Sequence, residues 1–174
     1  GGMQQRVGLA RSFATGAPIL LMDEPFSALD PLIRTDMQTM LLDLQTELKK
    51  TIVFITHDLD EALRLGDKIV ILRDGSIIQQ GDSQDILLNP ADDYIERFIK
   101  DVNRGRFIKV DAVMQSGAKP PAAGLPKLTS GTTLEAAAKE LTTSNYDAAI
   151  VTDAKGQPLG IVSLRQITAA LSAA

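Results

Sequence analysis

A short apolar run that ends in two adjacent carboxylates constrains this chain more than any other feature. Residues 19–22 (ILLM) contain no polar side chain, and Asp23 and Glu24 follow directly. Such a run is typical of a strand buried on both faces. Two carboxylates at its end are costly to remove from water unless a cation or hydrogen-bond donors compensate them. The pattern predicts a cation site or, as the structural alternative, a pair of residues that caps a following helix.

The elements around this run alternate between helix and strand. Apolar residues at helical spacing predict a helix over residues 4–15. Asp30, as an N-cap, and Pro31, at a first helical turn, predict a long helix. Residues 51–56 predict a second buried strand, and this order predicts two parallel strands of an α/β sheet. His57 then lies at the carboxyl edge of the sheet, where ligands of α/β proteins bind.

Composition argues against several function classes. The net charge is −4 and no basic stripe offsets it, so we expect no nucleic-acid partner. The chain has no cysteine, which excludes disulfides and zinc-thiolate sites and fits a reducing compartment such as the cytosol. Its apolar runs are far shorter than the roughly 18 residues that a spanning helix needs, so we expect no membrane crossing.

The rest of the chain predicts shorter elements and a second domain. Asp74-Gly75 between two apolar runs predicts a β-hairpin. We interpret Arg104-Gly105-Arg106 as a solvated connector and place a boundary there, giving domains 1–106 and 107–174. The helices that we expect after residue 56 span residues 59–65, 83–88, 94–99, 134–141 and 164–171. The expected strands span residues 68–73, 76–80, 148–152 and 159–163.

Four short motifs resemble, in order, those of the ATP-binding cassette (ABC) ATPase family. They are the end of the signature loop (GGMQQR, 1–6), the Walker B strand (ILLMDEP, 19–25), the D-loop (SALD, 27–30) and the switch-histidine segment (THD, 56–58). Agreement of four motifs in the same order supports the resemblance strongly. It extends over residues 1 to about 100 and implies the C-terminal part of a P-loop NTPase fold.

The resemblance implies a role for each residue at the predicted sheet edge. Asp23 would hold Mg²⁺ through its water shell, and Glu24 would be the general base for ATP hydrolysis. His57, the single histidine, would contact the γ-phosphate and stabilise the transition state. Without the family, a helix-capping or core imidazole is the alternative for His57.

The resemblance also implies residues that act across a subunit interface. Gly1, Gly2 and Gln4 belong to the signature end, which closes over the ATP of a partner subunit. A helix N-terminus favours such an anion, although two glycines also suit an ordinary flexible terminus. Asp30 would lie near the partner's active site, in addition to capping its own helix.

One part of the family's ATP site is missing from this sequence. No Gly-x-x-x-x-Gly-Lys-Ser/Thr phosphate loop occurs in it, and the chain begins with Gly rather than Met. We therefore expect upstream sequence to be missing, and we expect this chain by itself to hydrolyse no ATP.

The segment 134–171 resembles a CBS repeat, with GIVS at residues 160–163. CBS modules commonly bind an adenine nucleotide through Ser or Thr followed three residues later by Asp, whereas Gln166 follows Ser163 here. The alternative is a small α/β cap that serves dimerisation. A lone repeat is too small to cover all of its apolar residues, so we expect a partner for it, with self-association of residues 107–174 as one form. The residues concerned are Val151, Ile161, Val162, Leu164, Ile167 and Leu171.

An ABC ATPase followed by a CBS repeat resembles the importers of glycine betaine, proline or choline, which are often osmoregulatory. The resemblance implies an ABC-type ATPase that uses ATP and Mg²⁺ and forms a homodimer. Its expected partners are transmembrane permease subunits and, indirectly, a substrate-binding protein, at the cytoplasmic face of the cell membrane. The alternatives are an importer of another solute, such as a polyamine or sugar, and a non-catalytic regulatory fragment.

Overall fold

The computed structural model describes residues 2–118 and 124–172. The chain divides into two compact units, Gly1–Gly66 and Asp67–Ala174, both of mixed α and β structure. Each unit is described by itself below. Residue 106, the predicted domain boundary, lies within the second unit, and that boundary stays a prediction.

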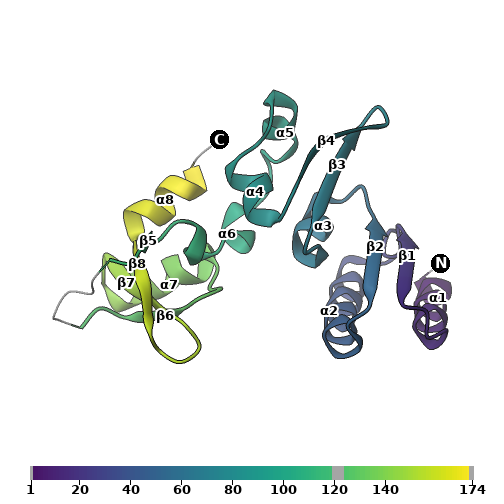
Figure 1. The fold of residues 1–174 in the computed structure, drawn as a ribbon, viewed down its shortest axis with the longest axis horizontal. Helices are drawn as coiled ribbons and strands as arrows, with labels where there is room; N and C mark the ends of the chain where they lie inside the picture. The colour runs from purple at the N-terminus through teal and green to yellow at the C-terminus, as the bar shows by residue number, and fades with distance from the viewer. Residues whose placement is uncertain (1, 119–123, 173–174) are drawn as a thin grey trace. The chain divides into compact units, whose positions relative to one another are not determined.

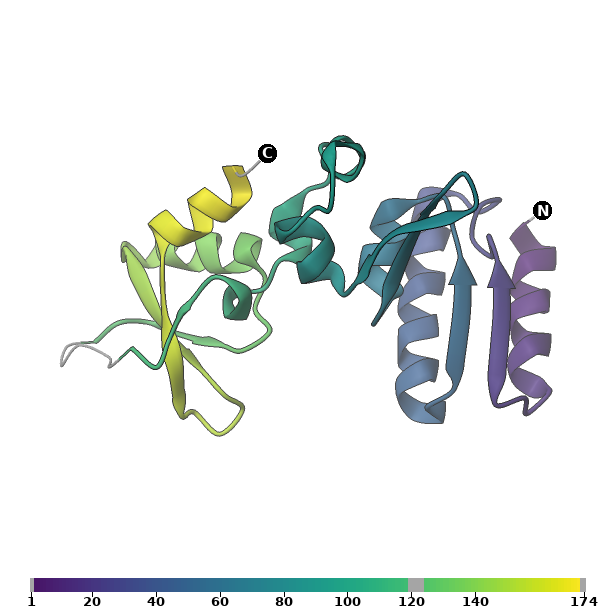
Figure 2. The same ribbon diagram turned by 45° about the horizontal axis from the view of Figure 1, so that its top comes forward.

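The first unit contains two parallel strands with helices beside them (Figures 1 and 2). Its elements are α1 (Gly2–Ala14), β1 (Ile19–Asp23), α2 (Pro31–Leu48), β2 (Thr51–Ile55) and α3 (Leu59–Leu65). β1 and β2 pair in parallel, from Ile19 opposite Thr51 to Asp23 opposite Ile55. The strand, helix, strand unit predicted from the sequence is therefore confirmed.

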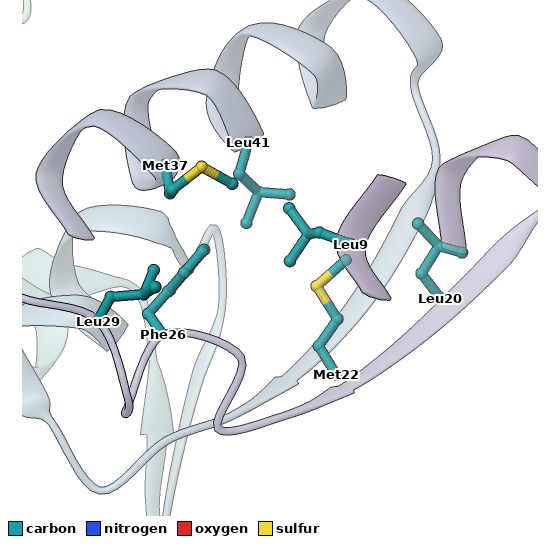
Figure 3. Packing of buried hydrophobic residues seen from close by; sticks show 7 residues of the cluster. All are labelled: Leu9, Leu20, Met22, Phe26, Leu29, Met37 and Leu41. Atoms are coloured by element: carbon teal, nitrogen blue, oxygen red, sulfur yellow. The ribbon is translucent and has the colours of Figure 1, made fainter. Parts of the chain in front are cut away.

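The core of this unit lies on one face of the β1–β2 pair. Figure 3 shows side chains of α1 and α2 meeting those of β1 and of the loop that follows β1. The cluster consists of Leu9, Leu20, Met22, Phe26, Leu29, Met37 and Leu41. Alternate residues along the strands point to the opposite face, and Leu21 is 79% exposed there. The prediction of a strand buried on both faces is wrong for the described residues, because helices cover only one face.

Local capping fixes where α2 and α3 begin. The carboxylate of Asp30 accepts the backbone N–H of Ile33 at 3.1 Å, and Pro31 is the first residue of α2, as predicted. Asp58 caps α3 in the same way, accepting the N–H of Glu61 at 3.2 Å. Each cap satisfies a backbone N–H that the first turn of its helix leaves without a partner.

The second unit begins with a hairpin, continues through short helices and ends in a four-stranded sheet. Its first elements are β3 (Ile69–Arg73), β4 (Ser76–Gly81), α4 (Ser83–Leu88), α5 (Asp93–Phe98), α6 (Arg104–Phe107) and η1 (Val110–Ala112). The later ones are β5 (Gln115–Ser116), β6 (Lys127–Thr129), α7 (Leu134–Ser144), β7 (Ala148–Thr152), β8 (Pro158–Ser163) and α8 (Leu164–Ser172). The hairpin is confirmed, because Asp74 and Gly75 both adopt the positive φ angles, 50° and 76°, that its turn requires.

The four strands of the sheet lie in the order β5, β8, β7, β6, with β6 parallel to β7 and the other pairs antiparallel. Val151, Val162 and Ile167 are fully buried within this unit. The expectation that a lone repeat leaves its apolar residues uncovered is therefore wrong for these three, because the sheet and its helices already bury them. Ile161 and Leu164 are partly buried. Leu171 remains 37% exposed.

The segment interpreted as a solvated connector is a short helix. Gly105 in α6 is buried, and a Cβ atom added to it would lie 3.3 Å from side-chain atoms of Glu135 and Leu171. The side-chain amide of Gln84 donates to the carbonyl of Phe107 at 2.9 Å and so joins α4 to this segment. The connector prediction is wrong, because the two arginines flank a glycine that packs against α7 and α8.

Candidate functional site

Glu24 and His57 meet at the carboxyl edge of the parallel strands. Glu24 directly follows β1, and its N–H donates to the carbonyl of Ile55 at 2.9 Å, which extends the strand pairing by one bond. His57 follows β2 by two residues. Its Nδ1 lies 2.9 Å from Oε1 of Glu24, and the two side chains are 74% and 45% exposed. The structure thus brings together two of the residues that the sequence singled out.

The backbone of Glu24 has an unusual conformation. Its φ angle is +43°, in the left-handed region that residues with a Cβ atom rarely adopt. The carbonyl of Glu24 accepts the N–H and the hydroxyl of Ser27, at 3.3 and 3.0 Å, in a tight turn. Strain of this kind collects at functional sites. Pro25 predicts the opposite, because a proline biases the residue before it toward extended conformations.

The charge on Glu24 favours the protonated form of His57. The hydrogen bond to Glu24 and the negative charge of that carboxylate raise the pKa of His57 above its ordinary value, and Asp58 and Glu61 add to the effect. The imidazolium then donates from Nδ1 to the carboxylate. A protonated, exposed imidazole at a strand edge is a suitable donor for an anionic ligand.

Asp23 lies at the end of β1 with its side chain exposed. Within residues 2–118 and 124–172, no group of three or more His, Cys, Asp or Glu side chains is arranged to hold a metal ion. A single exposed carboxylate suits Mg²⁺, which usually keeps several waters and takes phosphate oxygens as its other ligands. The residues present are therefore compatible with Mg²⁺ but do not form an all-protein cage.

The remaining predicted site residues are not joined to this pair by any hydrogen bond of the described part of the chain. The carboxylate of Asp30 caps α2, which was the structural alternative for it. Gly2 begins α1, and Gln4 lies exposed in its first turn. Gly1 lies outside the described residues.

Three residues to which the sequence assigned no role of their own line the same hollow as Glu24 and His57. They are Arg34 of α2, Thr56 after β2 and Glu61 of α3. For Glu61 the sequence did contain a signal, its position three residues after Asp58. An acidic N-cap followed by Glu at this spacing is typical of a helix start. Nothing in the sequence relates Arg34 to this edge.

Comparison with known proteins matches both parts of the chain. Residues 118–173 match the CBS domain family. The chain is 63% identical over 114 residues to the glycine betaine/carnitine transport ATP-binding protein GbuA of Listeria monocytogenes, which covers 66% of this chain and 29% of GbuA. It is 44% identical over 174 residues to the glycine betaine/proline betaine transport system ATP-binding protein ProV of Salmonella typhimurium, covering 100% and 42%. It is 46% identical over 164 residues to the trimethylamine N-oxide transport system ATP-binding protein TmoW of Pelagibacter ubique, covering 93% and 47%.

The sequence relatives indicate the class of protein to which this chain is related. The chain is homologous to the C-terminal part of ABC ATP-binding subunits and carries a CBS domain, so the predicted family and fold class are confirmed. Within this class, its homologues include the ATP-binding subunits of glycine betaine and proline betaine transport systems. The chain spans less than half the length of these relatives. Across the described residues, no helix combines the length and the hydropathy that a membrane span needs.

Proposed function

We propose that this chain is part of the ATP-hydrolysing subunit of an ABC importer for glycine betaine, proline betaine or a related quaternary amine. The observation that carries the proposal is the 2.9 Å contact between Glu24 and His57 at the carboxyl edge of parallel strands. The names of the relatives support the solute class, since two of the three name glycine betaine. In this proposal, residues 1–106 belong to the ATPase domain and residues 107–174 to a CBS-like regulatory repeat.

Glu24 is the general base in this proposal, and His57 is the donor to the γ-phosphate. The strained backbone of Glu24 holds its carboxylate at the strand edge, where a water molecule can be oriented for attack. The proton on Nδ1 of His57 is shared with Glu24. A phosphate oxygen at this edge would compete with Glu24 for that proton, so substrate binding would release the carboxylate to act as the base.

The proposed metal ligand and partner-facing residues complete the scheme. Asp23 would hold Mg²⁺ through water, and the ion would neutralise charge that develops on the phosphates. Gly1, Gly2 and Gln4 would face the ATP of a second subunit, as would Asp30 in addition to its cap. The composite sites would require a homodimer, docked on transmembrane permease subunits at the cytoplasmic face of the membrane and served by a substrate-binding protein.

The CBS-like repeat is proposed to regulate without binding a nucleotide through Ser163. The side-chain oxygen of Gln166 accepts both the N–H and the hydroxyl of Ser163, at 2.8 and 2.9 Å. The hydroxyl in turn accepts the N–H of Gln166 at 3.3 Å. Both side chains are thus used to start α8 in a reciprocal cap, which occupies the hydroxyl of Ser163 and the side-chain oxygen of Gln166.

A chimeric subunit tests the proposal, with this chain replacing the matching region of the Listeria relative. The unaltered chimera is expected to hydrolyse ATP and to support glycine betaine uptake with the relative's permease. Glu24→Gln should lower the turnover of ATP by on the order of 10²-fold or more and leave ATP binding largely intact. Glu47→Gln, an exposed carboxylate on α2, is the matched control and should behave as the unaltered chimera.

Two outcomes would contradict the proposal. An equal loss of ATP binding and turnover in Glu24→Gln would assign this carboxylate to folding or to the metal rather than to proton transfer. Steady ATP hydrolysis by the isolated chain that survives Glu24→Gln would show that its chemistry lies elsewhere.

A further inference from the structure

The side chain of His57 is exposed, but the residues on either side of it are held firmly. The hydroxyl of Thr56 donates to Oε2 of Glu61 at 2.8 Å and accepts the N–H of Asp58 at 3.0 Å. The carboxylate of Asp58 caps α3 and also accepts from Arg34 at 3.4 Å. The two neighbours of His57 are therefore tied to α3 and α2, while the imidazole itself projects from the edge.

The carboxylate that accepts the hydroxyl of Thr56 is buried. The side chain of Glu61 is only 6% exposed, and its Oε1 accepts the side-chain amide of Gln38 at 3.1 Å. Nε of Arg34 lies 3.9 Å from the same oxygen. A carboxylate so buried is costly without such partners, so its presence needs a reason beyond local packing.

The network continues along α2 away from His57. The amide oxygen of Gln38 accepts from Arg64 at 2.8 Å, and Arg64 donates to the hydroxyl of Thr39 at 2.9 Å. The oxygen and the nitrogen of the Gln38 side-chain amide are therefore both hydrogen-bonded, which orients the NH2 group that donates to Glu61. Thr39 occupies the far end of the network, where it provides a matched threonine for comparison with Thr56.

We propose that Thr56 and Glu61 are positioning residues that hold His57 against Glu24, an inference that rests on the ATPase function proposed above. Within the described part of the chain, the hydrogen bonds of the two side chains go to each other, to Gln38 and to the backbone of Asp58, and none goes to the side chain of Glu24 or His57. An exposed ion pair contributes little stability by itself, too little to fix the geometry of His57. The partly buried bond from Thr56 to Glu61 supplies the rigidity that the exposed pair lacks. It restricts the orientations open to the imidazole before reaction, so less conformational entropy is lost when the imidazole takes its reactive position.

The single histidine makes the test direct, because its imidazole signals in an NMR spectrum are unique. His57 is titrated in this 174-residue chain without nucleotide or metal. Thr56→Val removes the hydroxyl without changing charge and should lower the pKa of His57 toward its ordinary value, since the contact with Glu24 weakens. Thr56→Ser retains the hydroxyl and should restore the unaltered titration. Thr39→Val removes the hydroxyl at the far end and should leave the titration unchanged.

An unchanged pKa of His57 in a folded Thr56→Val variant would overturn the inference. If valine prevents folding, Thr56→Ala removes the same hydroxyl with less bulk, and its titration is judged by the same criterion. Equal shifts in Thr56→Val and Thr39→Val would indicate a general loosening of the unit and would also overturn it.

The catalytic consequence is measured in the chimera. Thr56→Val should lower kcat by on the order of 10-fold with little change in the KM for ATP, as expected when a transition-state contact is misplaced. A kcat equal to that of the unaltered chimera would overturn the positioning role. The titration involves no ATP, so a negative result there would leave the proposed function standing. An inactive chimera would contradict the proposed function without altering the titration.

Discussion

Asp30 has one role that the structure shows and one that we propose, and a pair of substitutions separates them. Its carboxylate accepts the N–H of Ile33 at 3.1 Å, with its own backbone extended at φ −65° and ψ 157°. Asp30→Ala removes the acceptor and should destabilise the start of α2 by about 1 kcal/mol, within a range of roughly 0.5–2 kcal/mol. Asp30→Asn keeps an acceptor of the same length and should leave stability nearly unchanged.

Amide hydrogen exchange in this chain measures the effect where it occurs. A loss of about 1 kcal/mol corresponds to roughly 5-fold faster exchange at Ile33, provided that the amide exchanges through opening of the helix start. Asp36→Ala removes an exposed carboxylate from the same helix and serves as the control for charge. In the chimera, both substitutions of Asp30 should reduce ATP turnover, because each removes the charge proposed to face the partner's site.

Equal exchange rates at Ile33 in Asp30→Ala and Asp30→Asn would refute the capping argument. Full ATP turnover in Asp30→Asn would instead refute the interface role and leave Asp30 as a helix cap alone.

Two further predictions concern the second unit. Burial raises the pKa of Asp111, but the N–H of Gly131, at 2.6 Å, and other donors lower it more, so the folded pKa lies below its ordinary value. Its stabilising contribution is present above the ordinary pKa and is lost as the pH falls through the lowered one. The free energy of unfolding of Asp111→Asn should therefore depend less on pH in that window than that of the unaltered chain. An identical pH dependence in the two chains would contradict this. Gly160→Ala should destabilise the sheet in urea unfolding, because its Cβ would lie 2.5 Å from the carbonyl of Gln115. Gly8→Ala, with open space around it, should be neutral or stabilising by roughly 0.5–1 kcal/mol, and equal losses in the two variants would refute the packing argument.

The sequence alone determined the local structure and the class of protein. Pro31 after Asp30 predicted where α2 begins, and Asp74-Gly75 predicted the hairpin, because these residues act on the backbone of their own neighbours. The order of strand, helix and strand was sufficient to predict parallel pairing and hence to place Glu24 and His57 at one edge. The short strand β6 was missed, because three residues in a segment rich in Pro and Gly show no alternation.

The tertiary structure decided which side chains are buried and which groups meet. Leu21 lies in an apolar run but is exposed, whereas Gly105 lies between two arginines but is buried, since burial depends on which helices cover a face. The left-handed backbone of Glu24 runs against the preference that Pro25 imposes. Arg34 and Glu61 meet from separate helices. Hydrogen bonds between residues far apart in the chain form only when the helices and strands pack. The bonds from α2 to Asp58 and Glu61 could therefore not be predicted from local sequence patterns.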